Sequence, residues 1–271
     1  MRAAALQFDV ALGDVAANLA AAEQGLREAA RRELDLVVLP EMWPSSFCEA
    51  EPELQTASEG AVERVREVSA ELGLVVCGSA WGPAEPGGPP SNRLHVFDAG
   101  RAVLAYDKVH LHSPTAEEQS FRAGARPPAT AETRAGLLTG VVCYDLRFGA
   151  LLQAALDGGA EILICVAQWP SARAAHWRAL VLGRAVEHQC CVVAANRTGT
   201  SLIGRKRREL RFPGNSLIAD PHGNALAEGR GEPGLVAAEL ELDEVRSARV
   251  RVPVRKDARP RLYERWRRGE G

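Results

Sequence analysis

The sequence predicts an α/β fold, in which short buried strands alternate with amphipathic helices. Two observations carry this prediction. Short apolar runs recur along the chain, as in 34–40 and 161–167, and are typical of strands buried on both faces. Between these runs lie segments whose apolar residues follow helical spacing. The 271 residues, 46% of them apolar, are enough to bury a sizeable core.

The N-terminal part of the chain predicts strand, helix and strand in succession. Residues 1–8 are typical of a first strand, and the helix that follows begins after Asp14, a suitable N-cap. Leu19, Leu26 and Ala30 recur on one face of this helix. The run 34–40 then ends in proline, as expected for the end of a buried strand.

The same alternation continues through the rest of the chain. A helix is expected over 62–72 and a strand over 74–79, and Ala99-Gly100 predicts a hairpin between strands 93–98 and 101–106, so the sheet is mixed. The second half predicts helices and further strands, namely strands 137–142, 161–167 and 190–196, helices 146–156 and 174–189, and short strands in 214–220 and 224–228.

Charge and composition bound the classes of function. The 33 basic and 35 acidic residues give a net charge of −2, which disfavours general binding to nucleic acid or to a membrane surface. The longest uncharged run, 72–84, is too short for a membrane span, and no secretory segment precedes Asp9. Six cysteines without a CxxC motif are typical of reduced thiols. We therefore expect a cytoplasmic location.

No linker divides the chain, so we expect one domain over residues 1–271 with a basic tail over about 245–271. The tail holds ten Arg or Lys against three Asp or Glu, and Val250 to Val254 alternates like an edge strand. A basic tail of this kind supports an alternative from another class of function, namely a non-catalytic interaction protein that uses the tail to bind an acidic partner.

Three reactive side chains follow or end apolar strands, namely Glu41, Lys108 and Cys143. In α/β sheets, ligands bind outside the carboxyl ends of the strands. A thiol needs a base to become a nucleophile, and a carbonyl under attack needs a positive donor for its oxygen. Taken singly, each residue has an ordinary structural explanation, but the three together predict nucleophilic catalysis.

The segments that carry these residues resemble the three signature motifs of the nitrilase superfamily of carbon–nitrogen hydrolases. They are Leu39-Pro40-Glu41-Met42, Lys108-Val109-His110-Leu111 and Cys143-Tyr144-Asp145-Leu146-Arg147-Phe148. The resemblance implies a four-layer α/β/β/α sandwich, a homodimer that pairs through helices on an outer face, and an enzyme without a metal or organic cofactor.

The resemblance also implies a role for each matched residue. Cys143 is the nucleophile, Glu41 the general base and Lys108 the oxyanion donor, helped by the backbone N–H of Tyr144. A second glutamate of the family precedes an aromatic residue and a glycine, here Phe121 and Gly124. This pattern falls on Glu117, and the adjacent Glu118 stays the alternative.

Further segments are similar to the omega-amidase branch, which hydrolyses 2-oxoglutaramate and 2-oxosuccinamate. They include Gln168 to Arg173 and Asn196 to Gly199. A small amide of this kind carries a carboxylate, and Arg173 is the candidate partner of that carboxylate. The alternative is that Arg173 faces solvent at the start of a helix. Trp43 and Trp169 are expected to wall the site, or to be core. The physiological substrate, and a preference for N-carbamoyl compounds or nitriles, stay open.

Overall fold

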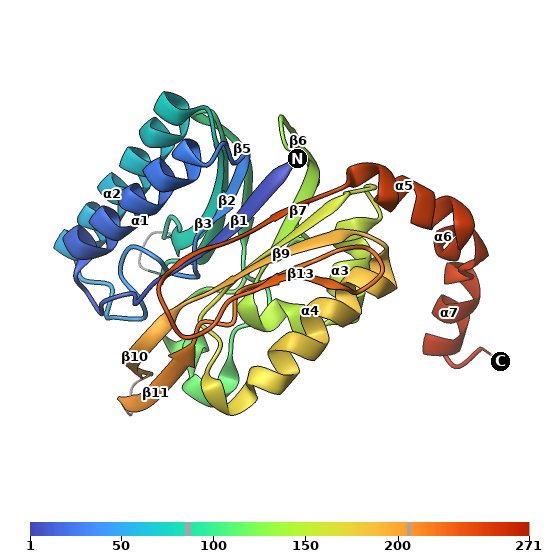
Figure 1. Cartoon of the computed structure of the whole chain (residues 1–271). Helices are drawn as coiled ribbons and strands as arrows, with labels where there is room; N and C mark the ends of the chain where they lie inside the picture. The colour runs from blue at the N-terminus through green and yellow to red at the C-terminus, as the bar shows by residue number, and fades with distance from the viewer. Residues whose placement is uncertain (85–87, 205–206, 271) are drawn as a thin grey trace.

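The computed structural model describes residues 1–84, 88–204 and 207–270. Two six-stranded sheets stack against each other, with order β14-β1-β2-β3-β4-β5 in one and β13-β12-β9-β8-β7-β6 in the other. Helices cover the outer face of each sheet, as Figure 1 shows. The predicted α/β/β/α sandwich is therefore confirmed.

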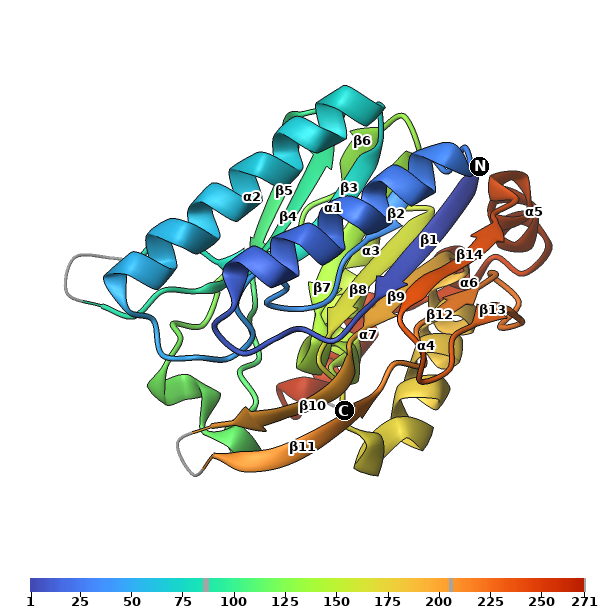
Figure 2. The same cartoon turned by 60° about the vertical axis from the view of Figure 1, so that its left-hand side comes forward.

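The first sheet is covered by two long helices, which lie side by side across it in Figure 2. Asp14 caps α1 by accepting from the backbone N–H of Ala17, as predicted, and Gly73 ends α2 in the left-handed conformation. The elements are β1 (Arg2–Gln7), α1 (Val15–Arg31), β2 (Leu36–Val38), α2 (Pro52–Leu72), β3 (Val75–Trp81), β4 (Asn92–Asp98), β5 (Arg101–Asp107) and β14 (Gly234–Glu239).

The second sheet has parallel strands β7, β8 and β9 at its centre. Its elements are β6 (Ala131–Thr133), β7 (Gly136–Val142), α3 (Gly149–Leu156), β8 (Ile162–Ala167), α4 (Ala174–His188), β9 (Cys191–Asn196), β12 (Leu217–Ala219) and β13 (Ala225–Glu228). Short 3-10 helices lie in the connections: η1 (Ser113–Thr115) and η2 (Glu117–Gln119) between β5 and β6, η3 (Cys143–Arg147) before α3, and η4 (Ser171–Arg173) before α4.

Alternation along the buried strands builds two cores at once. In β2, Leu36 and Val38 join the core between the sheets, whereas Val37 joins the core under α1 and α2. Successive strand residues point to opposite faces, and both faces of this sheet are covered. Among the described residues, no helix has the length and apolar character needed to cross a bilayer.

Several regions differ from the sequence predictions, among them β6 and β14, which were not predicted, and the helix expected from residue 146, which begins at Gly149. The hairpin of β10 (Thr198–Ile203) and β11 (Arg208–Pro213) was not predicted, and it extends from the edge of the sandwich in Figure 2. The strand expected at Val250 to Val254 is wrong, because these residues end α5 (Leu242–Arg251) and begin α6 (Val254–Asp257). Val245 and Ala248, three residues apart, bury one face of α5, so helical spacing prevails over the local alternation. The chain ends with α7 (Pro260–Arg267).

Candidate active site

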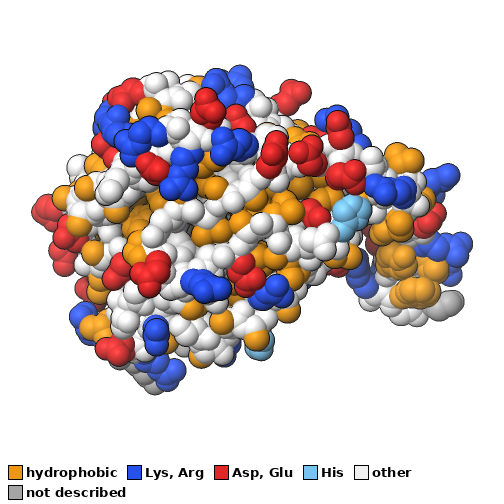
Figure 3. Space-filling view, viewed as in Figure 1, with side chains coloured by type: hydrophobic (Ala, Val, Ile, Leu, Met, Phe, Trp, Pro, Cys, Tyr) orange, Lys and Arg blue, Asp and Glu red, His pale blue; other side chains and the backbone are white. Residues whose placement is uncertain are grey.

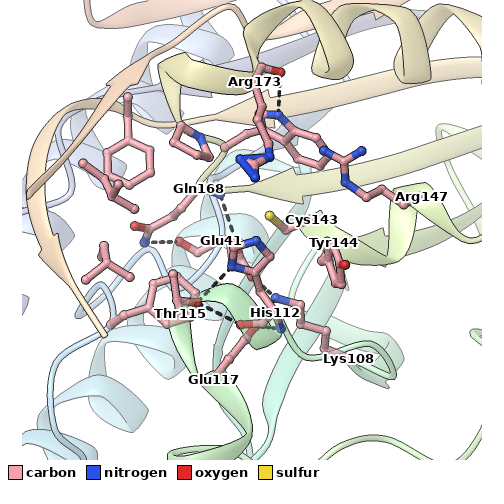
Figure 4. Close-up of a pocket in the computed structure, with 16 residues that line it drawn as sticks. Glu41, Lys108, His112, Thr115, Glu117, Cys143, Tyr144, Arg147, Gln168 and Arg173 are labelled. Atoms are coloured by element: carbon pink, nitrogen blue, oxygen red, sulfur yellow. Dashed lines mark hydrogen bonds and ion pairs between the residues drawn. The ribbon is translucent and has the colours of Figure 1, made fainter. Parts of the chain in front are cut away.

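The carboxyl ends of strands from both sheets meet at one cavity. Glu41 follows β2, Lys108 follows β5 and Cys143 follows β7, and all three line the cavity in Figure 4. The cavity has a volume of about 50 Å³, which is room for a few water molecules. The three residues singled out by the motifs are thus brought together by the stacking of the two sheets.

Cys143 is the first residue of η3 and has a φ of 48°, in the left-handed region. Such a conformation is uncommon for a residue other than glycine and is often found at functional sites. Burial raises the pKa of its thiol well above the ordinary value, as does the negative charge of Glu41, while Lys108 acts in the opposite sense. The thiol is therefore neutral at rest and needs a base.

Glu41 is the neighbouring carboxylate at the cavity, and its two oxygens have different partners. Oε1 accepts from Lys108 Nζ at 2.8 Å and from Asn92 Nδ2 at 2.9 Å, whereas Oε2 accepts from the backbone N–H of Gln168 at 2.9 Å. Oε1 accepts from two donors and Oε2 from one, so Oε2 is the oxygen with room to accept a further proton. Burial raises the pKa of Glu41, which suits a group that must accept a proton.

Lys108 lies between two buried carboxylates. Its ammonium is 2.8 Å from Glu41 and 2.8 Å from Glu117, and its side chain is 1% exposed. Burial alone would lower the pKa of Lys108, but the charges of Glu117 and Glu41 raise it well above the ordinary value. The ammonium therefore stays charged, as an oxyanion donor must.

Glu117, and not Glu118, holds this lysine. Glu117 is buried and also accepts from the backbone N–H of His112 at 2.6 Å, whereas Glu118 is exposed. The left-handed Ala116 turns the chain immediately before η2 and sets which of the two adjacent side chains faces inward. The alternative left open by the sequence is resolved in favour of Glu117 as the residue at the site.

Of the residues predicted to contact the substrate, some line the cavity and one does not. Tyr144, Trp169 and Arg173 line the cavity, whereas the described lining does not include Trp43. Trp43 is 2% exposed and packs in the core under α1 and α2. Its indole lies over Gly78, where a Cβ atom would come within 2.8 Å of the ring. The expectation that Trp43 walls the site is thus wrong, because the missing side chain at Gly78 makes room for the indole in the core.

Several residues at the site were missed by the sequence reasoning. Asn92 and Gln168 bind the Glu41 carboxylate, and Arg147 lines the cavity beside Tyr144. Arg147 lies within the third motif and Gln168 directly follows a predicted strand. Their positions in the sequence could therefore have marked both as candidates for the site. An apolar wall faces the same cavity and comes largely from the unpredicted hairpin, with Phe47, Ile203, Leu210 and Phe212.

Arg147 and Arg173 are two guanidinium groups at the cavity without an ion pair to any carboxylate of the described chain. Arg147 lies over the Trp169 ring, 4.7 Å from its centroid, and its Nη2 is 3.3 Å from His176 Nδ1. In Figure 4, Arg173 and Arg147 lie on the side of Cys143 away from Lys108. Unpaired cations beside a small cavity are suited to an anionic group on a bound molecule.

Known proteins resemble this chain in both sequence and structure. Residues 2–250 match the family described as carbon-nitrogen hydrolase. A 2-oxoglutaramate amidase of Bacillus subtilis is 32% identical over 262 residues, covering 95% of this chain and 97% of that protein. Omega-amidase YafV of Escherichia coli K12 is 30% identical, over 83% of this chain and 84% of that protein. A mutant of the amidase from Nesterenkonia sp. AN1, solved in complex with butyramide, aligns with a TM-score of 0.83 and 25% identity, over 98% and 97% of the two chains.

Proposed function

This chain belongs to the carbon–nitrogen hydrolase family, and we propose that it is a thiol amidohydrolase that converts the terminal amide of a small carboxylate substrate to acid and ammonia. One observation carries the proposal: a thiol and a carboxylate, both of raised pKa, line one small cavity together with a charged ammonium that is bonded to the carboxylate. These are the nucleophile, base and oxyanion donor that attack on an amide carbonyl requires.

The first half of the reaction forms a thioester. Glu41 takes the proton of Cys143 as sulfur attacks the amide carbonyl carbon, and Lys108 stabilises the oxygen on which negative charge develops. The backbone N–H of Tyr144, in the first turn of η3, is the second donor. Glu41 then returns the proton to the amide nitrogen, the carbon–nitrogen bond breaks and ammonia leaves. Glu117 keeps the ammonium of Lys108 in place throughout.

The second half of the reaction hydrolyses the thioester. Glu41 is ionised again once ammonia has left, and it deprotonates a water molecule that attacks the acyl carbon. The carbon–sulfur bond breaks, the thiolate recovers the proton from Glu41, and the acid departs. The same base therefore serves both steps, which explains why one carboxylate with a raised pKa is sufficient.

The substrate that the cavity favours is a short amide with a carboxylate at its far end, such as 2-oxoglutaramate. Arg173 is the proposed partner of that carboxylate, and Arg147 adds a second positive charge nearby. Trp169 and the apolar hairpin residues face the methylene chain between the two ends. The names of the two amidase relatives agree with this substrate class.

The test is ammonia release from a panel of 2-oxoglutaramate, succinamate, glutamine, asparagine, an N-carbamoyl amino acid and a simple nitrile. We expect the first two to be hydrolysed fastest. Faster turnover of the N-carbamoyl compound or the nitrile would reassign the substrate within the same family. The Cys143→Ser variant is expected to fold normally and to release no ammonia, and wild-type turnover by this variant would refute the nucleophile assignment.

We also propose that the protein is a single-domain cytoplasmic homodimer. All six cysteines are free, as expected in a reducing compartment. The tail leaves apolar side chains exposed, among them Val250 at 81% and Trp266 at 56%. In Figure 3, orange side chains gather on the tail. Exposed apolar patches of this kind are typical of subunit contacts. Light scattering after gel filtration is expected to give twice the 29.1 kDa chain mass.

A further inference from the structure

Arg197 is a fully buried cation close to the site, and neither the motifs nor the mechanism above gives it a role. It follows β9, its side chain is 0% exposed, and it packs over the Phe212 ring at 4.6 Å from the centroid. Burying a guanidinium is costly unless its donors are satisfied. Each of the three nitrogens has a partner: Nε donates to Thr198 O at 3.0 Å, Nη1 to Ser46 Oγ at 3.2 Å and to Gln168 Oε1 at 3.1 Å, and Nη2 to Asp9 Oδ1 at 2.5 Å.

These partners come from loops that follow different strands. Asp9 follows β1, Ser46 follows β2 and Gln168 follows β8, so one guanidinium joins three loops at the carboxyl ends of both sheets. The backbone leaves room for this arrangement at Gly199, where φ is +86° and a Cβ atom would lie 2.2 Å from Asp9 Oδ1. The carboxylate of Asp9 reaches Arg197 because position 199 has no side chain.

The bond from Arg197 also sets the orientation of the Gln168 amide. Because a guanidinium can only donate, it requires the oxygen Oε1 on its side and leaves Nε2 directed to the backbone carbonyl of Glu41, at 2.9 Å. The backbone N–H of the same Gln168 donates to Glu41 Oε2, at 2.9 Å. Oε2 is the oxygen of Glu41 with room to accept the thiol proton.

We propose that Arg197 is a positioning residue, which acts through Gln168 to hold Glu41 in place and to stabilise its ionised form. The effect of Arg197 on catalysis rests on the proposed function, in which Glu41 is the base. When Arg197 is removed, the Gln168 segment loses its anchor and the N–H donated to Glu41 weakens. A carboxylate that loses a donor becomes harder to ionise, so its pKa rises.

The experiment follows alkylation of Cys143 by iodoacetamide at a series of pH values, with the Cys143 peptide quantified by mass spectrometry. In this reaction sulfur forms a bond to carbon, iodide leaves, and the thiol proton passes to Glu41 or water. The readout is the alkylated cysteine and not the release of ammonia. We expect Arg197→Met to move the acid limb of the rate profile up by about one pH unit, a roughly tenfold loss of rate on that limb. Arg197→Lys, which keeps the charge and loses the fork of donors, is expected to lie in between.

The matched control is Arg178→Met, because Arg178 is half exposed and pairs with Glu228 away from the cavity. Its profile is expected to match that of the wild type. A purely structural role of Arg197 would lower the fraction of Cys143 that reacts without moving the limb. A limb unmoved in Arg197→Met, or in Arg197→Lys should the methionine variant not fold, overturns the proposal. If the limb moves but the wild type hydrolyses no amide of the panel, the proposed function fails and the positioning role stands.

Discussion

The carboxylate of Asp145 binds His110 twice, through the backbone N–H at 2.8 Å and the imidazole Nδ1 at 2.9 Å. It also accepts from the hydroxyl of Tyr106 at 2.8 Å. Asp145 lies two residues after Cys143, and His110 lies two residues after Lys108. One buried carboxylate therefore ties the loop of the nucleophile to the loop of the oxyanion donor.

Asp145→Asn tests this connection. The amide presents one acceptor atom where the carboxylate presents two, so at least one donor of His110 or Tyr106 loses its partner. We expect kcat to fall at least tenfold with little change in KM, because Lys108 shifts relative to Cys143 and the cavity mouth does not. Steady-state kinetics on the preferred amide measure both constants. An unchanged kcat would show that the two loops hold their positions without this carboxylate.

Lys108→Ala removes the side-chain oxyanion donor. A donor of this kind is worth on the order of 3 kcal/mol in the transition state, so the rate is expected to fall at least a hundredfold. The variant also leaves Glu41 and Glu117 buried without their shared cation. We therefore expect a lower melting temperature at neutral pH. Retention of more than a tenth of wild-type kcat in a folded variant would contradict the role.

Glu117→Gln is expected to move the pH profile of kcat/KM toward lower pH. The negative charge of Glu117 raises the pKa of Glu41 and that of Lys108, so removing it lowers both. The acid limb, where Glu41 must be ionised, and the alkaline limb, where Lys108 must be charged, then both shift downward. Glu118→Gln is the matched control, because this neighbour is exposed, and its profile is expected to be that of the wild type. Equal profiles for the two variants would remove Glu117 from the charge cluster.

Arg173→Met tests recognition of the substrate carboxylate. A charge-assisted hydrogen bond contributes about 1.5–3 kcal/mol, so KM for 2-oxoglutaramate is expected to rise at least tenfold. KM for a neutral amide such as butyramide is expected to change little. Arg178→Met serves again as an exposed arginine outside the cavity. Equal effects of Arg173→Met on the charged and neutral amides would exclude a carboxylate contact at Arg173.

Sequence reasoning was most successful where the signal is local. The strands around 34–40, 74–79 and 161–167 were predicted from their apolar residues, and the cap at Asp14 from its side chain and the helical pattern that follows. The motifs marked Glu41, Lys108 and Cys143 because each reactive residue adjoins a strand end. The indole of Trp43 was misplaced because its packing depends on Gly78, a residue of a different strand.

The amino-acid order alone is thus enough for the alternation of helices and strands, and for the three reactive residues. The network around the base, with Asn92, Gln168 and Arg197, emerged only from the folded chain. Asn92 and Gln168 lie 51 and 127 residues from Glu41, and Arg197 lies 151 residues from Ser46. The physical reason is that burial patterns repeat along neighbouring residues, whereas these hydrogen bonds exist only once two separate sheets have stacked and their loops have met.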